Sequence, residues 1–458
     1  MLKANGLNIR RGSVSRAMLL ICALLISVNA LSKPAQSYWA RGWASAVVQS
    51  TSAPPWTFEQ KFTADNAGPN TYFGTSVAVE GDTVVVGADS ATVGTNTYQG
   101  AAYVFQRQGN SWVQVQELTA SDGAAGDQFG YRVAIAGDTI VVGAFTATVD
   151  SNYNQGAAYI FTRAGDTWTE SQKLISDDGG YFDDFGSAVA LDPTGTIAYI
   201  GAIGATIGMN AAQGAVYVFE QSNGTWDQVQ KLTVPDGEAY DDFGTRIALD
   251  GSTMLIGAND ATVNGDPGVG EAFVFTYTDG SWLQTQKLTA SDGQPEDYFG
   301  ISTALQGDTA LIGANNATVD GNGYQGAVYV FSLANGVWTQ SGKLVAEDGG
   351  QGDYFGISLS LDGIDVLIGA DGATIGANSD QGAVYVFENG NGGWQQIQKL
   401  TVADGATEDY FGASLVLSGN TAFVGTPSPT IDGNGFQGAA YYFFRDGIFG
   451  DGFESTTP

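Results

Sequence analysis

The residues in this sequence that could do chemistry are pairs of aspartates that recur at a fixed spacing. The pattern Asp-Gly-x-x-x-Asp-x-Phe-Gly appears six times. Its first aspartates are Asp122, Asp178, Asp236, Asp292, Asp348 and Asp404. Its second aspartates are Asp127, Asp183, Asp241, Asp297, Asp353 and Asp409. Carboxylates at this density could hold Ca²⁺, which takes about six to eight oxygen ligands, or could attract a cationic partner.

A second set of acids lies in longer loops, where Asp320 and Asp432 each open an Asp-Gly-Asn-Gly stretch. These stretches are similar to the start of a calcium loop, but Tyr324 and Phe436 stand where a further oxygen ligand is needed. The loops with aspartate pairs hold 20 acids and the longer loops hold 8, together 28 of the 48 acidic residues, and none of these loops contains Lys or Arg. We therefore predict an acidic face that binds Ca²⁺ weakly, docks a cationic partner, or does both. The alternative for each single aspartate is a turn residue, because Asp-Gly favours turns.

The composition excludes most catalytic chemistry. The chain has no histidine, and Cys22 is its only cysteine, so Ser-His-Asp triads, His-ligated zinc and thiol nucleophiles are excluded in a chain that has lost Cys22. Paired carboxylates could still cleave a polysaccharide or a phosphoester, and this enzyme remains one alternative. We expect that the protein is not an enzyme, because the acids recur in every repeat, whereas catalysis usually needs one unique set of residues. A purely structural surface protein is a further alternative.

The elements that must position these acids are repeats. Seven Phe-Gly dipeptides, the first at Phe73, follow one another at intervals of 56, 56, 58, 56, 56 and 56 residues. After each Phe-Gly comes an apolar run that ends in a glycine. A Gly-led stretch, such as 326–331, and then a Trp-led stretch, such as 282–288, follow it. These are four short β-type segments per unit, and four antiparallel strands at this period are typical of a propeller blade. The phenylalanine is expected to pack between blades.

The ends of the repeat array predict a closed ring. The seventh unit stops after 441–444 without a Trp-led stretch, and an unattached one, 56–62, stands at the start. This stretch is expected to complete the last blade, because closure removes exposed strand edges. We therefore predict an all-β fold, a seven-bladed β-propeller of four-stranded antiparallel blades over residues 56–445, with the last blade closed by the N-terminal strand. Alternating strand directions would place the aspartate-pair loops and the longer loops together on one face.

These residues resemble a known family. Phe-Gly, a strand, Gly313-Ala314 and then 326–331 are similar to the FG-GAP repeat of integrin α-subunit propellers, and closer still to its secreted bacterial version. The resemblance implies a seven-bladed propeller used for binding or adhesion, without a particular ligand. The calcium loop of integrin-type repeats lies in the first hairpin, where this chain has only short turns such as Gly307-Asp308, so those calcium sites are not carried over.

The N-terminal residues predict export. Lys3, Arg10, Arg11 and Arg16 precede the apolar run 17–28, and small residues follow at a cleavage position after Ala30. We expect a signal peptide at 1–30, with an uncleaved anchor as the alternative, a linker at 31–55 and a tail at 446–458. Loss of four basic residues changes the net charge from -31 to 13 - 48 = -35. A secreted or cell-surface monomer follows, whose partner is an extracellular protein or glycan rather than nucleic acid, which this charge repels.

Overall fold

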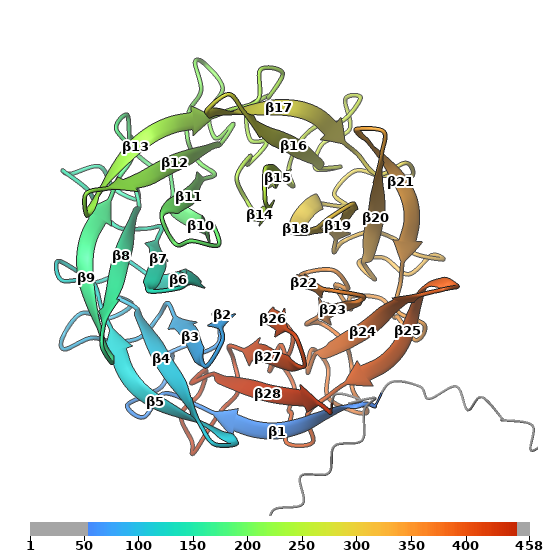
Figure 1. Cartoon of the computed structure of the whole chain (residues 1–458). Coiled ribbons are helices and arrows are strands. Elements are labelled where there is room, and N and C mark those ends of the chain that lie inside the picture. Colours follow the sequence, from blue (N-terminus) through green and yellow to red (C-terminus); the bar gives the residue numbers. More distant parts are fainter. Residues whose placement is uncertain (1–53, 447–458) are drawn as a thin grey trace, which may run out of the picture. The chain divides into compact units, whose positions relative to one another are not determined.

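The computed structural model describes residues 54–446, which form seven four-stranded antiparallel sheets arranged as the blades of a ring (Figure 1). The described residues contain strands, turns and bends but no helix. The predicted fold class, an all-β seven-bladed propeller, is confirmed. The predicted signal peptide (1–30) and nearly all of the linker (31–55) and tail (446–458) lie outside the described residues.

Each blade runs from an innermost strand beside the axis to an outermost strand at the rim. The innermost strands are β2 (Ser76–Glu80), β6 (Phe129–Ala136), β10 (Phe185–Leu191), β14 (Ile247–Asp250), β18 (Phe299–Gln306), β22 (Leu359–Asp362) and β26 (Ser414–Ser418). The second strands are β3 (Thr83–Ala88), β7 (Thr139–Ala144), β11 (Ile197–Ala202), β15 (Thr253–Ala258), β19 (Thr309–Ala314), β23 (Asp365–Ala370) and β27 (Thr421–Thr426). The third strands are β4 (Ala101–Gln108), β8 (Ala157–Ala164), β12 (Ala215–Ser222), β16 (Glu271–Thr278), β20 (Ala327–Ala334), β24 (Ala383–Gly390) and β28 (Ala439–Arg445). The outermost strands are β5 (Ser111–Leu118), β9 (Thr167–Leu174), β13 (Thr225–Leu232), β17 (Ser281–Leu288), β21 (Val337–Leu344), β25 (Gly393–Leu400) and β1 (Trp56–Phe62).

The apolar pattern of each strand matches its place in the blade. The second strand β7 is buried along its whole length, which suits a strand covered by neighbouring blades on both faces. The outermost strand β5 alternates between exposed and less exposed residues, as a strand at the rim should. Burial thus follows directly from the periodicity of each segment.

The Phe-Gly pair joins neighbouring blades. Phe129 is fully buried, as are the six equivalent phenylalanines, and its apolar cluster includes Val85 of the preceding blade as well as Tyr159 of its own. Gly130 beside it has φ +97°, and a Cβ there would meet the carbonyl oxygen of Ala101 at 2.2 Å. Only glycine fits this close approach, so the repeated dipeptide is a packing device between blades, as predicted.

The strand β1 lies at the outer edge of the blade formed by β26, β27 and β28, and pairs with β28 in antiparallel register from Trp56↔Arg445 to Phe62↔Ala440. At the axis, each innermost strand contacts that of the next blade, and β26 contacts β2. The first and last parts of the propeller are therefore covalently distant but share one sheet.

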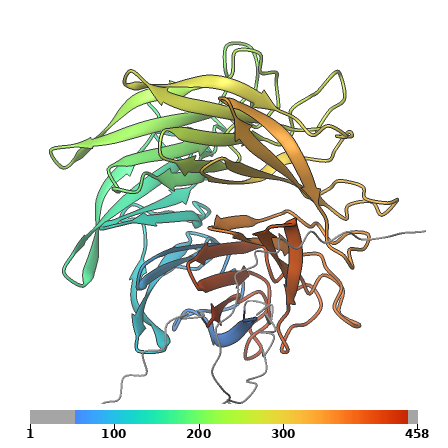
Figure 2. The ribbon, with the colours of Figure 1, turned by 45° about the vertical axis from the view of Figure 1, so that its right-hand side comes forward.

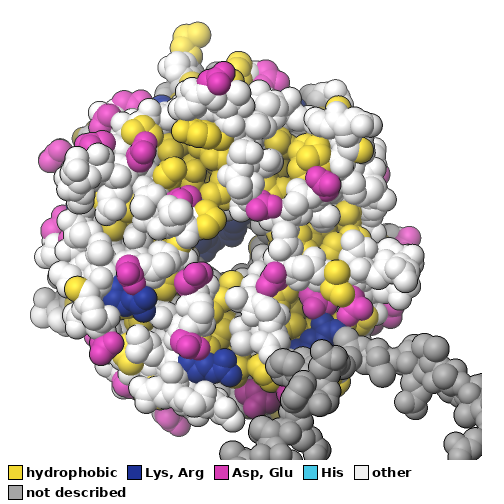
Figure 3. Space-filling model, viewed as in Figure 1, with side chains coloured by type: hydrophobic (Ala, Val, Ile, Leu, Met, Phe, Trp, Pro, Cys, Tyr) yellow, Lys and Arg dark blue, Asp and Glu magenta, His cyan; other side chains and the backbone are white. Residues whose placement is uncertain are grey.

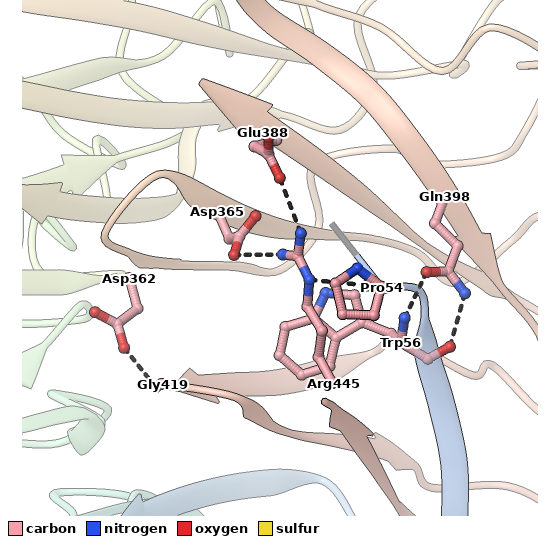
Figure 4. Close-up of polar contacts among 8 residues, drawn as sticks. All are labelled: Pro54, Trp56, Asp362, Asp365, Glu388, Gln398, Gly419 and Arg445. Atoms are coloured by element: carbon pink, nitrogen blue, oxygen red, sulfur yellow. Dashed lines mark hydrogen bonds and ion pairs between the residues drawn. The ribbon is translucent and has the colours of Figure 1, made fainter. Parts of the chain in front are cut away.

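A repeated hydrogen-bond bracket links the outermost strands of successive blades. The side chain of Gln116 accepts from the backbone N–H of Trp168 at 2.8 Å and donates to its carbonyl oxygen at 2.6 Å. The same two bonds join five further Gln–Trp pairs, including Gln398 of β25 with Trp56 of β1 (Figure 4). Strand β1 therefore has the same contact with the preceding blade as the other outermost strands have, with the exception of β25.

Arg445, at the end of β28, adds further contacts at the place where β1 and β28 meet the preceding blade (Figure 4). Its guanidinium donates to Asp365 at 2.7 Å and to Glu388 at 2.9 Å, both in the preceding blade, and to the carbonyl oxygen of Pro54 at 3.0 Å. The side chain is mostly buried, so these charge-assisted bonds are shielded from water. The residue fixes the start of β1, the end of β28 and the neighbouring blade together.

Connections sort onto two sides of the ring (Figure 2). Tight hairpins join the first to the second strand of every blade and the third to the fourth strand of the first six blades, on what we call the hairpin face. Each has two residues, except the five-residue turn 192–196 between β10 and β11. The longer loops between second and third strands, and those between blades, lie on the opposite side, which we call the loop face. Residues 54–446 hold no helix of the length and apolar character needed to cross a membrane.

Candidate binding face

The first aspartate of each motif is neutralised by a lysine of the following blade. Asp122, after β5, lies 2.7 Å from the Nζ of Lys173 on β9. The equivalent pairs are Asp178–Lys231, Asp236–Lys287, Asp292–Lys343, Asp348–Lys399 and Asp404–Lys61, at 2.6 to 2.8 Å. The absence of Lys and Arg from these loops therefore does not leave the first aspartates without a balancing cation. The loops contain no lysine, but the outermost strand of the next blade supplies one.

A tyrosine completes most of these pairs. The Tyr159 hydroxyl donates to Asp122 at 2.8 Å, and the Lys173 ammonium lies 5.4 Å from the centre of the Tyr159 ring. Burial alone would raise the pKa of the Asp122 carboxyl, but the hydrogen bonds from Lys173 and Tyr159 and the lysine charge outweigh it and lower that pKa. The carboxylate is therefore charged and already engaged.

Two blades vary this arrangement in a compensated way. In the first blade the lysine position is Glu117 and the aspartate position is Asn66, whose amide donates to Glu117 at 3.0 Å. In the fourth blade Lys287 binds both Asp236 and Glu271, and Phe273 stands at the position of the tyrosine. The contact between loop and strand persists even where its charges change.

The second aspartate of each motif is buried and caps its own loop. Asp127 accepts the backbone N–H of Ala124 at 2.8 Å, and the same bond from the residue three positions earlier recurs at Asp183, Asp241, Asp297, Asp353 and Asp409. All six side chains are buried. Burial raises the pKa of the Asp127 carboxyl, with the bond from Ala124 working in the opposite direction. In the opening repeat Thr71 binds Gly68 in the same way. These carboxylates hold the loop conformation.

Backbone hydrogen bonds join the two kinds of loop into one surface. The N–H groups of Gly126 and Gln128 donate to the carbonyls of Thr97 and Tyr98 at 3.0 and 3.1 Å. Matching bonds recur around the ring. The longer loop of one blade is thus fixed to the connection that enters the next blade, so the loop face is a built surface.

Asp320 and Asp432 differ from the paired aspartates because both are exposed. Asp320 has φ 50° and Gly321 has φ 90°, between Val319 and Asn322, which exchange two backbone hydrogen bonds. This is the geometry of a tight hairpin turn that favours Asp-Gly. Asp432 repeats it. Their carboxylates stand at loop tips, where a partner could reach them.

Residues 54–446 bring no group of three or more Asp, Glu, His or Cys side chains close enough to form a metal site. Because the first aspartates bind lysine and the second bind backbone N–H groups, the motif offers few free oxygens to a cation. Calcium binding at these pairs stays a prediction.

Exposed aromatic side chains are the feature that sequence reasoning missed. Loop-face aromatics that are 42 to 67 % exposed are Tyr98, Tyr153, Tyr181, Phe182, Tyr240, Tyr324 and Phe436. Several meet across neighbouring blades. Phe436 stacks on Tyr72 with ring centres 5.6 Å apart, and Tyr324 lies 6.2 Å from Tyr354. The signal was present, because Tyr324 and Phe436 are the residues that spoil the calcium-loop pattern.

A hollow of about 510 Å³ opens on this face between the third, fourth and fifth blades. Tyr240, Tyr298, Asp242 and Asp260 line it. Burial, then the hydrogen bond and charge of Asp260, raise the pKa of Asp242 to about 8. The raised pKa favours the neutral form of this carboxyl, and the hollow combines it with two aromatic rings.

Comparison with known families agrees with the repeat and ring just described. The FG-GAP repeat matches seven segments, residues 56–105, 112–161, 168–219, 226–275, 282–331, 338–387 and 394–443. The chain belongs to the FG-GAP repeat family. Each matched segment begins in an outermost strand and ends in the third strand of the next blade, so the sequence repeat of the FG-GAP chain is offset from its blade. FG-GAP propellers are interaction domains, typically extracellular or on surfaces. No curated protein matches the chain.

Proposed function

We propose that this FG-GAP propeller is a non-catalytic, exported binding protein whose loop face docks a protein with a basic surface. The observation that carries the proposal is the coincidence, on one face, of exposed aromatic rings with exposed carboxylates in loops that contain no Lys or Arg. Export rests on the predicted signal peptide and on the typical location of the family.

The aromatic residues would supply most of the binding free energy. Tyrosine and phenylalanine bury large areas at low entropic cost, and interface hot spots are rich in aromatic residues. Backbone hydrogen bonds between the loops hold two aromatic pairs in place, Phe436 with Tyr72 and Tyr324 with Tyr354. Such rings are preorganised, so little conformational entropy is lost on docking.

The acids would select the partner and speed its approach. A net charge of -31 steers a basic protein and repels an acidic one. In this proposal Asp320 and Asp432 contact the partner. The twelve aspartates of the repeated motif position the loops, since lysines or backbone N–H groups already occupy them. Calcium is not required.

Binding to purified basic extracellular proteins and to an array of neutral and acidic glycans would test the proposal, with and without Ca²⁺. The expected result is saturable binding to one or more basic proteins that weakens as salt rises. The double variant Tyr324→Ala/Phe436→Ala should weaken it at least about tenfold, in line with hot-spot losses. Leu283→Ala, an exposed apolar residue on the outermost strand β17, is the matched control and should bind like wild type.

Three outcomes would contradict the proposal. Binding to neutral glycans alone, insensitive to salt, would favour a lectin. Turnover of a glycan or phosphoester, abolished by one carboxylate substitution, would favour the enzyme alternative. Equal binding by the double variant and wild type would remove the loop face from the interaction.

A further inference from the structure

The axial channel of the ring carries two basic residues in an otherwise small and neutral set. The third residue after the phenylalanine of each Phe-Gly lies at the start of an innermost strand. In blade order these residues are Ser76, Arg132, Ala188, Arg246, Ser302, Ser358 and Ser414. Four blades thus use serine, two use arginine, and alanine stands in the blade between the arginines.

The serines show what this position does in the ordinary repeat. Ser302, Ser358 and Ser414 each donate to a glycine carbonyl of the next blade at 2.5 to 2.7 Å, and Ser76 accepts from the N–H of Val133. Serine is therefore sufficient for blade-to-blade bonding. Arginine here is an addition that packing between blades does not require.

Neither arginine finds a carboxylate partner. Arg132 donates to the carbonyl of Tyr131 at 2.9 Å, and Arg246 donates to the carbonyl of Thr245 at 2.7 Å. The ion pairs within residues 54–446 include Arg163 and Arg445 but neither of these two. A guanidinium has five N–H donors, so each of the two keeps about four donors free in the described part of the chain.

Both arginines line one shared cavity. A space of about 130 Å³ is lined by Arg132, Arg246, Ser302, Thr303 and Ser358, among others. This is well above the roughly 10–15 Å³ that one water needs. Basic side chains are visible deep in the central opening (Figure 3). Among the described residues, the buried hydroxyl of Thr303 has no hydrogen-bond partner.

The two arginines concentrate positive charge at this point. Burial, then the charge of Arg132, lower the pKa of Arg246, because both disfavour a second positive charge here. Arginine nevertheless stays charged at neutral pH. Arg132 is held in place by its contact with the Tyr131 ring, 4.3 Å from the guanidinium carbon to the ring centre. The charge of Arg132 also acts on the carboxyl of Asp89, whose pKa burial raises, but no carboxylate that the structure describes lies within ion-pair distance of either arginine. Two positioned guanidinium groups that line one cavity can bind planar or tetrahedral oxyanions.

We propose that the axial channel is a binding site for a small dianionic oxyanion of the phosphate and sulfate class, held between Arg132 and Arg246. The net negative charge of the protein opposes the approach of an anion at long range, but salt screens that field within about 10 Å. At contact, charge-assisted hydrogen bonds from the guanidinium groups outweigh this long-range repulsion. The site is independent of the proposed loop-face function and uses different residues.

Calorimetric titration of the full chain with phosphate, and separately with sulfate, at constant ionic strength set by chloride, would test the proposal. The expected result is saturable binding of either oxyanion near one equivalent, and a melting temperature that rises and saturates with oxyanion concentration. Chloride at the same ionic strength should do neither.

Two variants and a control locate the site. Arg132→Ser and Arg246→Ser install the residue that four other blades carry, so folding should persist, and each should weaken phosphate binding at least tenfold. Arg107→Ser, an equal change of charge at the partly exposed end of β4, should leave affinity unchanged. No saturable binding by wild type, or wild-type affinity in both channel variants, would overturn the proposal. The wild-type titration decides even if a variant fails to fold.

Discussion

At the scale of single residues, the molecule repeats one ionic contact with compensated substitutions. Six blades place an aspartate against the lysine of an outermost strand, while the first blade uses Asn66 against Glu117. An asparagine amide can donate to a carboxylate, whereas an aspartate there would repel it. In the first blade both partners differ from those in the other blades, and the side chains still meet in a hydrogen bond although no ion pair forms.

This compensation predicts the sign of a double-mutant cycle. Asn66→Asp alone should destabilise the protein because two carboxylates would face each other. Adding Glu117→Lys should restore the arrangement of the other blades and recover the loss. Both positions are exposed, so the coupling should be only about 0.5 kcal/mol. Urea midpoints of the four proteins measure it, and additive effects of the two changes would contradict the interpretation.

At the scale of elements, the bracket between outermost strands is broken once. The position of the bracketing glutamine in β21 is Gly342. Its target would be Trp394 on β25, which is only half-buried, whereas the six other repeat tryptophans are buried. The missing bracket and the looser tryptophan occur at the same blade boundary.

Gly342→Gln should therefore stabilise the propeller. The backbone has ordinary strand geometry, and a Cβ would meet Val330 at an unstrained 3.6 Å. Two new hydrogen bonds to the backbone of Trp394 should add about 1 kcal/mol to the free energy of unfolding. Gly342→Ala is the matched control, since it changes only the backbone entropy. Denaturant midpoints compare them, and a glutamine variant no more stable than the alanine variant would show that the bracket does not form.

At the scale of the whole molecule, buried carboxyls on the loop face tie stability to pH. Burial raises the pKa of Asp371 to about 7 and, together with Asp183, raises that of Asp184 to about 6. Burial and the neighbours Asp260, Asp184 and Asp241 raise that of Asp242 further. A carboxyl whose folded pKa exceeds its unfolded value of 3.8 stabilises the fold fully below that value and loses this contribution as pH rises through the folded pKa.

The melting temperature should therefore fall as pH rises from about 4 to about 8, since the unfolded carboxyls lose their protons near 3.8 while the folded ones keep theirs until pH passes the raised pKa values. Asp242→Asn should flatten the fall because the amide does not titrate. Asp308→Asn, at an exposed hairpin turn, removes the same charge and should keep the wild-type slope. Scanning calorimetry across this range measures both. Equal slopes for wild type and Asp242→Asn would exclude Asp242 as the titrating group.

The sequence by itself determined the seven-bladed ring, because glycine, phenylalanine and tryptophan recur at an interval that only a blade explains. It also placed the aspartates in loops of one face. Tertiary structure alone decided what those aspartates do, since Lys173 and Asp122 lie in different blades and 51 residues apart. Exposure of Tyr324 and convergence of Arg132 with Arg246 on the axis were likewise settled by the ring, because the two arginines stand in different blades and occupy only two of the seven equivalent positions.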